Sequence, residues 1–188
     1  MNQSILYICS CCGKEHQEWP SLAFISPKHY QILSAADKED MAEIDTDFCI
    51  IRYPEQTDRF IRCTLTQKVS DHCEDLDYGL WVSLSEKNFN DYTENFTNDN
   101  YEATYFGWLC NDIPEYEFDK SIPTTVYLRG KGMRPEIVPN KDFEHPFVKD
   151  YFNGITKQEA ERRISNMLNN IEENDKTTEI KRPWWKLW

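Results

Sequence analysis

Glycine and positive charge are both scarce in this chain. Six glycines among 188 residues exclude collagen-like and Gly-rich low-complexity sequences. Lysine and arginine number 21 against 33 aspartates and glutamates, which gives a formal net charge of −12. Nucleic-acid binding needs concentrated Lys and Arg to neutralise phosphates. We therefore expect no nucleic-acid partner.

Long apolar runs are missing as well. No stretch approaches the roughly 20 apolar residues that span a bilayer, and the opening residues MNQSILYICSCCG lack the basic and apolar regions of a signal peptide. The seven cysteines are an odd number, and without an export signal their thiols are expected to stay reduced. We therefore expect a cytoplasmic bacterial protein.

Enough apolar material is present for a real core, since 39% of the residues are hydrophobic and 14% are aromatic. Short β-prone segments are joined by turns, helical spacing occurs at a few places, and no βαβ rhythm is visible. The expected strands cover residues 5–8, 22–25, 48–53, 60–65, 79–84, 101–110, 124–128 and 136–138. The expected helices cover residues 27–41, 85–96, 145–154 and 156–171. This pattern predicts an α+β fold on a mainly antiparallel sheet with a few flanking helices.

We expect one domain over residues 1–170, with an N-terminal cysteine knuckle at residues 5–16. Residues 171–188 are interpreted as a linker followed by a tail. Ser85 is the expected N-cap of its helix, Thr156 and Glu159 form a capping-box pattern, and Gly154 is the expected end of the preceding helix.

The knuckle is a CxxCG motif formed by Cys9, Cys12 and Gly13. Two thiolates at this spacing on a tight turn can bind one zinc ion, and glycine allows the turn. His16 follows closely and can add an imidazole. Because a second CxxC is missing, the remaining ligand candidates are scattered: Cys49, His72, Cys73 and His145. The competing interpretation is that these cysteines are ordinary buried thiols.

Several segments, taken in order, resemble the bacterial family known as domain of unknown function 2199. They are CSCCGKEH, DFCII, GLWVSLSEKNF, YFGWL, RPEI, and EHPF followed by NGIT. The resemblance covers residues 5 to about 170, and it implies no established activity. It does imply a metal site with Cys9, Cys12, His16 and Cys49 as ligands, and it also matches His145. Cys11, Cys63, Cys73 and Cys110 fall outside the family pattern.

Other patterns favour plain structural roles. Arg129–Gly132 is a short basic turn without the spacing of a phosphate-binding loop. Trp81 and Trp108 lie in apolar strand patterns and are predicted to pack in or near the core. A cysteine nucleophile, Cys49 or Cys12 with His145 or His16 as base, is an alternative that no local motif supports.

The C-terminal segment IKRPWWKLW, residues 180–188, has three basic residues, no acidic ones and three tryptophans. Trp184, Trp185 and Trp188 are therefore candidate partner-binding residues. Such a segment suits insertion into a partner protein, docking on its own acidic body, or weak contact with a membrane surface.

These observations favour a non-catalytic protein-binding module, similar in kind to an immunity protein or an adaptor, whose partner is a basic protein. Its zinc would be structural. One alternative is a metal- or thiolate-dependent enzyme, and another is a peripheral membrane adaptor that uses the tail.

Overall fold

The computed structural model of this protein describes the backbone of residues 6–8, 15–130 and 132–180, and side chains within residues 18–130 and 132–168. The strands are β1 (Leu6–Ile8), β2 (Glu15–Gln17), β3 (Leu22–Ala23), β4 (Ala42–Ile44), β5 (Phe48–Arg52), β6 (Thr57–Gln67), β7 (Leu76–Ser83), β8 (Thr104–Leu109), β9 (Pro123–Tyr127) and β10 (Glu136–Pro139). The helices are α1 (Lys28–Gln31), α2 (Ala35–Met41), α3 (Glu86–Asn95), α4 (Pro146–Asn153) and α5 (Lys157–Ile180).

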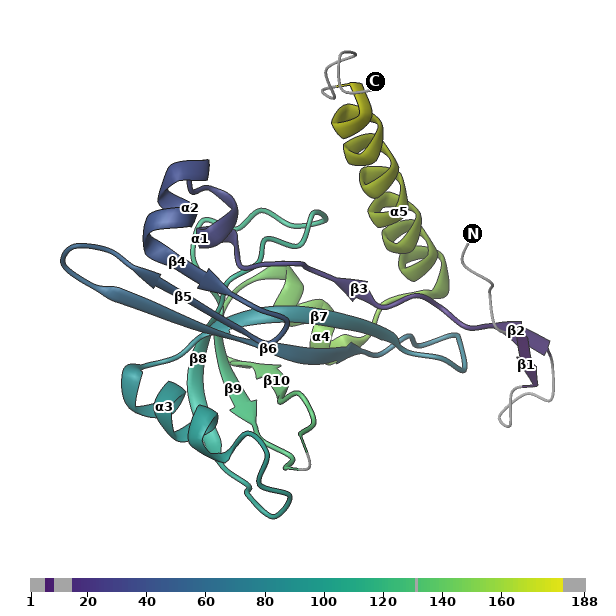
Figure 1. The fold of residues 1–188 in the computed structure, drawn as a ribbon. Coiled ribbons are helices and arrows are strands. Elements are labelled where there is room, and N and C mark those ends of the chain that lie inside the picture. Colours follow the sequence, from purple (N-terminus) through teal and green to yellow (C-terminus); the bar gives the residue numbers. More distant parts are fainter. Residues whose placement is uncertain (1–5, 9–14, 131, 181–188) are drawn as a thin grey trace.

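Strands β6 to β10 close into a barrel (Figure 1). Consecutive strands pair antiparallel from β6 through β10. β10 then pairs in parallel with β6, where Glu136 lies opposite Thr64. In an up-and-down run of five strands the first and the fifth point the same way, so the closing pair has to be parallel. β5 and β4 extend the sheet beyond β6, and β3 lies parallel to β7.

The α+β class is thus confirmed, and most strand pairs are antiparallel as predicted, but the sheet closes into a five-stranded barrel with a parallel closing pair, which was not predicted. Hydrophobic alternation marks where strands lie and which face is buried, and it carries no information on which strands become neighbours. The predicted N-terminal knuckle is not shown, because residues 9–14 lie outside the described residues.

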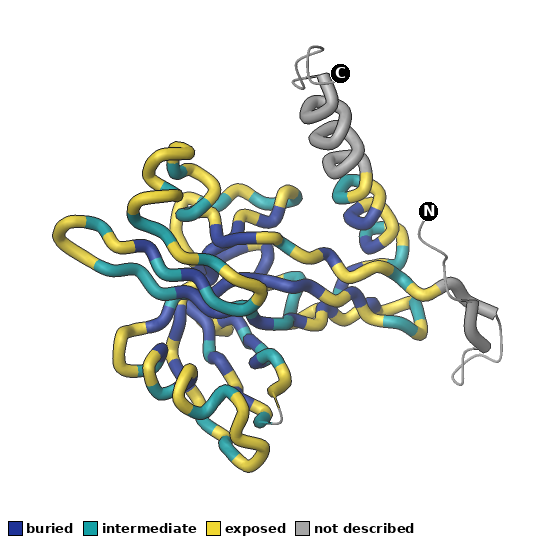
Figure 2. The backbone as a smooth tube through the Cα atoms, in the orientation of Figure 1, coloured by how far each residue is buried: buried dark blue, intermediate teal, exposed yellow. Residues whose placement is uncertain are grey.

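The core lies on both faces of the long strands. The barrel interior contains the main cluster, with residues such as Ile61, Leu80 and Val82 fully buried. A second cluster lies on the outer face of β5, β6 and β7 and consists of Cys49, Ile51, Phe60, Trp81 and Cys110. The segment through α1 covers this outer face, which explains why β7 is buried almost throughout (Figure 2).

Helix ends follow the predicted signals closely. The Ser85 hydroxyl accepts a hydrogen bond from a backbone N–H of the first turn of α3 at 3.3 Å, and Thr156 Oγ1 accepts one from the N–H of Glu159 at 3.2 Å. Gly154 ends α4 with a φ of +83°. The predicted helix over residues 27–41 is two helices, because Ser34 breaks the run and caps α2. Strands β2 and β4 were not predicted.

α5 runs on to Ile180 and so covers residues 171–180, the predicted linker. Its first turns pack on the barrel through Ala160 and Ile164, and the remainder projects from the body (Figure 1). None of the helices in the described part of the chain has the length and apolar character needed to cross a membrane.

Candidate functional site

The structure describes only some of the predicted metal ligands. Cys9 and Cys12 lie outside the described residues. His16 lies in β2, opposite Tyr7 of β1. Cys49 lies in β5, where its side chain is 0% exposed. Among the described residues, no group of three or more His, Cys, Asp or Glu side chains is arranged to bind a metal ion.

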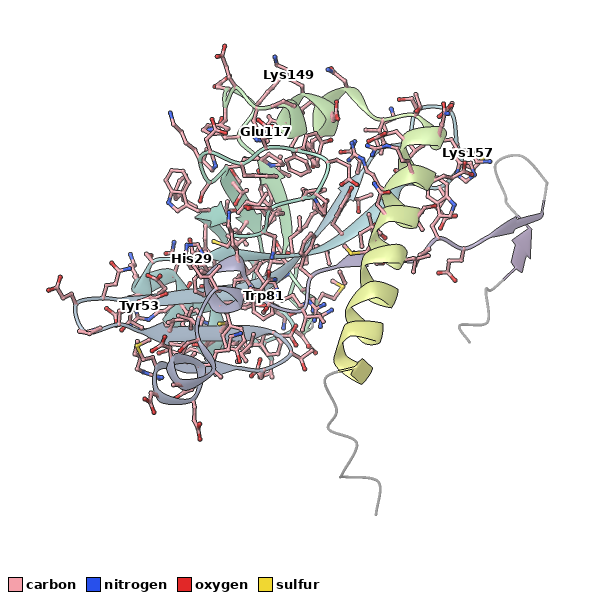
Figure 3. The ribbon with its side chains drawn as sticks, turned by 90° about the horizontal axis from the view of Figure 1, so that it is seen from above. His29, Tyr53, Trp81, Glu117, Lys149 and Lys157 are labelled. Carbon is pink, nitrogen blue, oxygen red and sulfur yellow. The ribbon has the colours of Figure 1, made fainter. Side chains whose placement is uncertain are left out.

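Cys49 and His16 belong to opposite ends of the molecule. The β1–β2 hairpin lies at one end of the barrel and β5 extends toward the other (Figure 1). In Figure 3, Lys157 marks the hairpin end, while Tyr53, just beyond β5, and His29 lie at the far end. Burial, with a smaller contribution from the Asp45 carboxylate, raises the pKa of the Cys49 thiol to about 12. The Cys49 thiol is therefore protonated at neutral pH.

The His145 side chain uses both ring nitrogens in hydrogen bonds near the start of α4. Its Nδ1 accepts a hydrogen bond from the N–H of Phe147 at the start of α4, at 3.1 Å. Its Nε2 then carries the proton and donates it to the carbonyl oxygen of Glu117, at 2.8 Å. Both ring nitrogens are thus used in holding the entry to α4. The candidate partner-binding residues Trp184, Trp185 and Trp188 lie outside the described residues.

A cavity of about 640 Å³ opens on the outer face of the barrel, and we call it the barrel groove. Its floor is a row across three strands, in which Phe60 of β6 is paired with Ser83 of β7 and Ser83 with Trp108 of β8. Residues paired directly across strands point to the same face. Asp58 and Cys110 lie two residues from Phe60 and Trp108, so they share that face.

The walls of the barrel groove come from distant parts of the chain: His29 of α1, Gln56 of the β5–β6 turn, Lys120, Ser121 and Phe143. Backbone hydrogen bonds fix α1 here, because the N–H of Lys28 donates to the carbonyl oxygen of Cys110 at 2.8 Å. Asn111 adds a buried clamp, accepting from the N–H of Trp81 at 2.7 Å and donating to the carbonyl oxygen of Ser26 at 3.0 Å. The groove is thus built on a rigid frame.

The groove lining includes one thiol, Cys110, and one imidazole, His29. Burial raises the pKa of the Cys110 thiol to about 11, and its Sγ donates to the carbonyl oxygen of Trp108 at 3.2 Å. His29 lies against the Phe60 ring with centroids 5.3 Å apart. The Nδ1 of His29 is buried and has no hydrogen-bond partner among the described residues. Cys110 is thus a protonated donor, and the His29 ring lines the groove with its Nδ1 buried.

The groove combines aromatic rings with charge. Trp108 is 44% exposed, and its ring meets that of Phe106 edge-on at 5.1 Å. The Asp58 carboxylate accepts a hydrogen bond from the Gln56 amide at 3.2 Å and makes no ion pair within the part of the chain described here. Lys120 is exposed. The site therefore offers a carboxylate beside aromatic faces, with one ammonium on its rim.

A second cavity of about 190 Å³ continues the first around α1 and shares His29, Cys110, Lys120 and Ser121 with it. It adds Ile32, which is 73% exposed, and two further carboxylates, Asp112 and Asp119. Asp112 forms an ion pair with Lys28. Because they share four lining residues, the two cavities are neighbours on one side of the barrel.

Sequence reasoning missed this site. Trp81 is fully buried as predicted, but Trp108, also predicted to pack in or near the core, is partly exposed on the groove floor. One signal was available, because Trp108 alternates with buried Gly107 and Leu109 and therefore points away from the barrel interior. His29, Asp58 and Lys120 carry no local motif, since only the closed barrel brings them together.

The family is now clear. Residues 8–155 match the family described as an uncharacterised protein conserved in bacteria, DUF2199, so the chain belongs to that family. The matched region contains the whole barrel and both cavities. Comparison with curated proteins and with solved structures finds no match.

Proposed function

We propose that this protein is a non-catalytic binding module that takes a basic segment of a partner protein into the barrel groove, with a lysine or arginine side chain of the partner against Asp58 and Trp108. The observation that carries the proposal is the Asp58 carboxylate, which forms no ion pair with any described residue, in the same cavity as the partly exposed Trp108 ring. A cation above an indole face gains from the ring quadrupole, and a guanidinium fits a carboxylate through two parallel hydrogen bonds.

The charge of the whole chain supports the same partner. A net charge of −12 attracts a basic protein over distances comparable with the Debye length and speeds its encounter. Asp112 and Asp119 extend the acidic lining beyond the first cavity. Lys120 supplies a donor on the rim, where a backbone carbonyl oxygen of an extended partner segment can accept from it.

The chemistry of Cys110 supports binding over catalysis. A nucleophilic cysteine works as a thiolate, which needs a lowered pKa or an adjacent base. Burial raises the pKa of Cys110 instead, and its Sγ donates to a carbonyl oxygen. The thiol thus closes the groove floor as a small, weakly polar group.

A labelled peptide tests the proposal. We suggest a fluorescein-tagged Gly/Ser peptide that carries several arginines, with binding to the full chain followed by anisotropy near physiological salt. We expect Asp58→Asn and Trp108→Ala each to weaken binding by about tenfold, which corresponds to about 1.4 kcal/mol. A peptide with neutral citrulline in place of arginine should bind the unaltered protein no more tightly than the arginine peptide binds Asp58→Asn.

Matched controls separate the groove from bulk charge. Glu94→Gln removes an exposed carboxylate on α3, and Phe152→Ala removes an exposed ring on α4. Both should leave the affinity unchanged. If Glu94→Gln weakens binding as much as Asp58→Asn does, the interaction is non-specific attraction to an acidic protein and the groove proposal is wrong.

A further inference from the structure

We propose that the basic residue taken into the barrel groove is the C-terminal residue of the partner protein, and that Lys120 and Ser121 bind its free α-carboxylate while Asp58 binds its side chain. This inference rests on the proposed function and adds to it which part of the partner enters the groove. The ligand is then a single arginine or lysine that carries a cation and a carboxylate.

The barrel groove contains two opposite charges that do not neutralise each other. Asp58 and Lys120 both line its cavity, whereas Asp119, the neighbour of Lys120, lines the second cavity. Neither Asp58 nor Lys120 forms an ion pair with the other, or with any further residue that the structure describes. A ligand with both a cation and an anion is complementary to both charges at once.

The segment that carries Lys120 is anchored on both sides. The carbonyl oxygen of Glu117 accepts a hydrogen bond from Nε2 of His145 at 2.8 Å. Ile122 is fully buried, and its carbonyl oxygen accepts a hydrogen bond from the N–H of Leu109 at 2.9 Å. Leu109 directly follows the exposed tryptophan of the groove floor, so this hydrogen bond holds the segment beside strand β8.

Asp58 is also held by its surroundings, at the start of β6. It pairs with Ile51 of β5, and the carbonyl oxygen of the next residue, Arg59, accepts a hydrogen bond from the N–H of Leu84 at 2.9 Å. The Gln56 amide donates to the Asp58 carboxylate at 3.2 Å. The backbones that carry the carboxylate and the ammonium are therefore in place before a ligand binds, which lowers the entropy cost of binding.

A C-terminal arginine or lysine presents both charges from one residue. Its side-chain cation fits the Asp58 carboxylate and the Trp108 ring, and its α-carboxylate can accept hydrogen bonds from the Lys120 ammonium and the Ser121 hydroxyl. A hydrogen bond between two ionised groups is stronger than one to a neutral carbonyl oxygen. Lys120 therefore favours a C-terminal residue over an internal one, and capture of a C-terminal carboxylate is a recurring mode of peptide recognition.

The net charge of the chain gives this inference a distinct signature. A charge of −12 attracts the more positive of two peptides. A peptide whose C-terminus is amidated carries one more positive charge than the same peptide with a free acid. Overall attraction therefore favours the amide, so a preference for the free acid requires a local cation at the binding site.

Two fluorescein-tagged Gly/Ser peptides test the inference, each ending in one arginine, one as the free acid and one as the amide. Binding to the full chain is followed by anisotropy near physiological salt. We expect the acid to bind about three- to fivefold more tightly, the size expected for an exposed charge pair. Lys120→Met should abolish this preference and Lys120→Arg should keep it. Lys68→Met, which removes an exposed lysine directly after β6, at the opposite end of that strand from Asp58, should also keep it.

A third peptide, which ends in citrulline as the free acid, separates this inference from the proposed function. If the arginine acid binds more tightly than the citrulline acid, but the arginine acid and amide bind alike, the proposed function stands and the inference is overturned. The inference is also overturned if Lys120→Met still prefers the acid. If arginine gives no advantage over citrulline, the proposed function fails and the inference fails with it.

Discussion

Replacing Arg163 with methionine tests how α5 is held against the barrel. The Arg163 side chain is 1% exposed and is surrounded by four partners. Its guanidinium donates to Glu159 at 2.8 Å, to the hydroxyls of Tyr78 at 3.2 Å and Tyr116 at 2.5 Å, and to Asp150 at 3.3 Å. Methionine keeps much of the apolar volume and removes every one of these donors.

The expected loss of stability depends on which interactions each partner of Arg163 keeps in Arg163→Met. Breaking a fully buried pair costs about 3–5 kcal/mol, but Asp150 and Glu159 are 41% and 28% exposed and regain water. Tyr116 still donates to Asp150 at 2.5 Å. Tyr78 is buried and loses its partner, which costs about 1–3 kcal/mol. We therefore expect Arg163→Met to lower the free energy of unfolding by about 2–3 kcal/mol, or the Tm by roughly 5–10 °C.

Urea unfolding followed by tryptophan fluorescence measures this loss, with Arg162→Met as the control. Arg162 is half-exposed and pairs with the same Glu159 at 2.8 Å. Because surface ion pairs contribute little, the control should change the stability by less than about 1 kcal/mol. Equal losses in the two variants would refute the assignment of Arg163 as the buried anchor of α5.

Three further predictions concern the barrel and its helices. A Cβ added at Gly107 would lie 2.3 Å from Val82 Cγ1, so Gly107→Ala should cost about 1–3 kcal/mol in urea unfolding; a second substitution, Val82→Ala, should recover part of that cost, and full additivity would argue against the clash. Ser85→Ala should cost about 1 kcal/mol through loss of the α3 N-cap, and an unchanged midpoint would show that the cap is dispensable. The hydrogen bond from Arg162 leads the effects that lower the pKa of Glu159. The ionised Glu159 carboxylate therefore stabilises the fold fully above its unfolded pKa of about 4.3. This stabilisation is lost as the pH falls through the lower pKa of Glu159 in the folded state. The stability gap between the unaltered protein and Glu159→Gln should accordingly narrow in acid, and a gap of constant size from pH 7 to pH 3 would contradict this origin.

Local features of the fold were predictable because they depend on nearby residues. The N-caps at Ser85 and Thr156 and the end of α4 at Gly154 follow from side chains that satisfy helix termini within a few residues. Strand positions follow from alternation, which decides the buried face. Closure of the barrel depends on β10 meeting β6, a contact between residues far apart in the chain, and no local pattern encodes it.

The groove was beyond local reasoning for the same reason. Its floor joins Phe60, Ser83 and Trp108 through strand register, and α1 adds His29 from far earlier in the sequence. Cysteine spacing predicts the first half of a metal motif, Cys9 and Cys12, which lie outside the described residues. Spacing alone does not choose the remaining ligands, because they would come from parts of the chain far apart in sequence.

In the proposed function, a partner's basic side chain occupies the barrel groove beside Trp108. The most direct measurement is an NMR titration of ¹⁵N-labelled full chain with the arginine peptide, following the tryptophan indole N–H signals. The Trp81 indole is the internal control, because it is buried and donates to the carbonyl oxygen of Phe24 at 3.0 Å. We predict a saturable shift of the Trp108 indole signal, lost in Asp58→Asn, with the Trp81 signal unmoved. A Trp108 signal that stays in place while the peptide binds would contradict the claim.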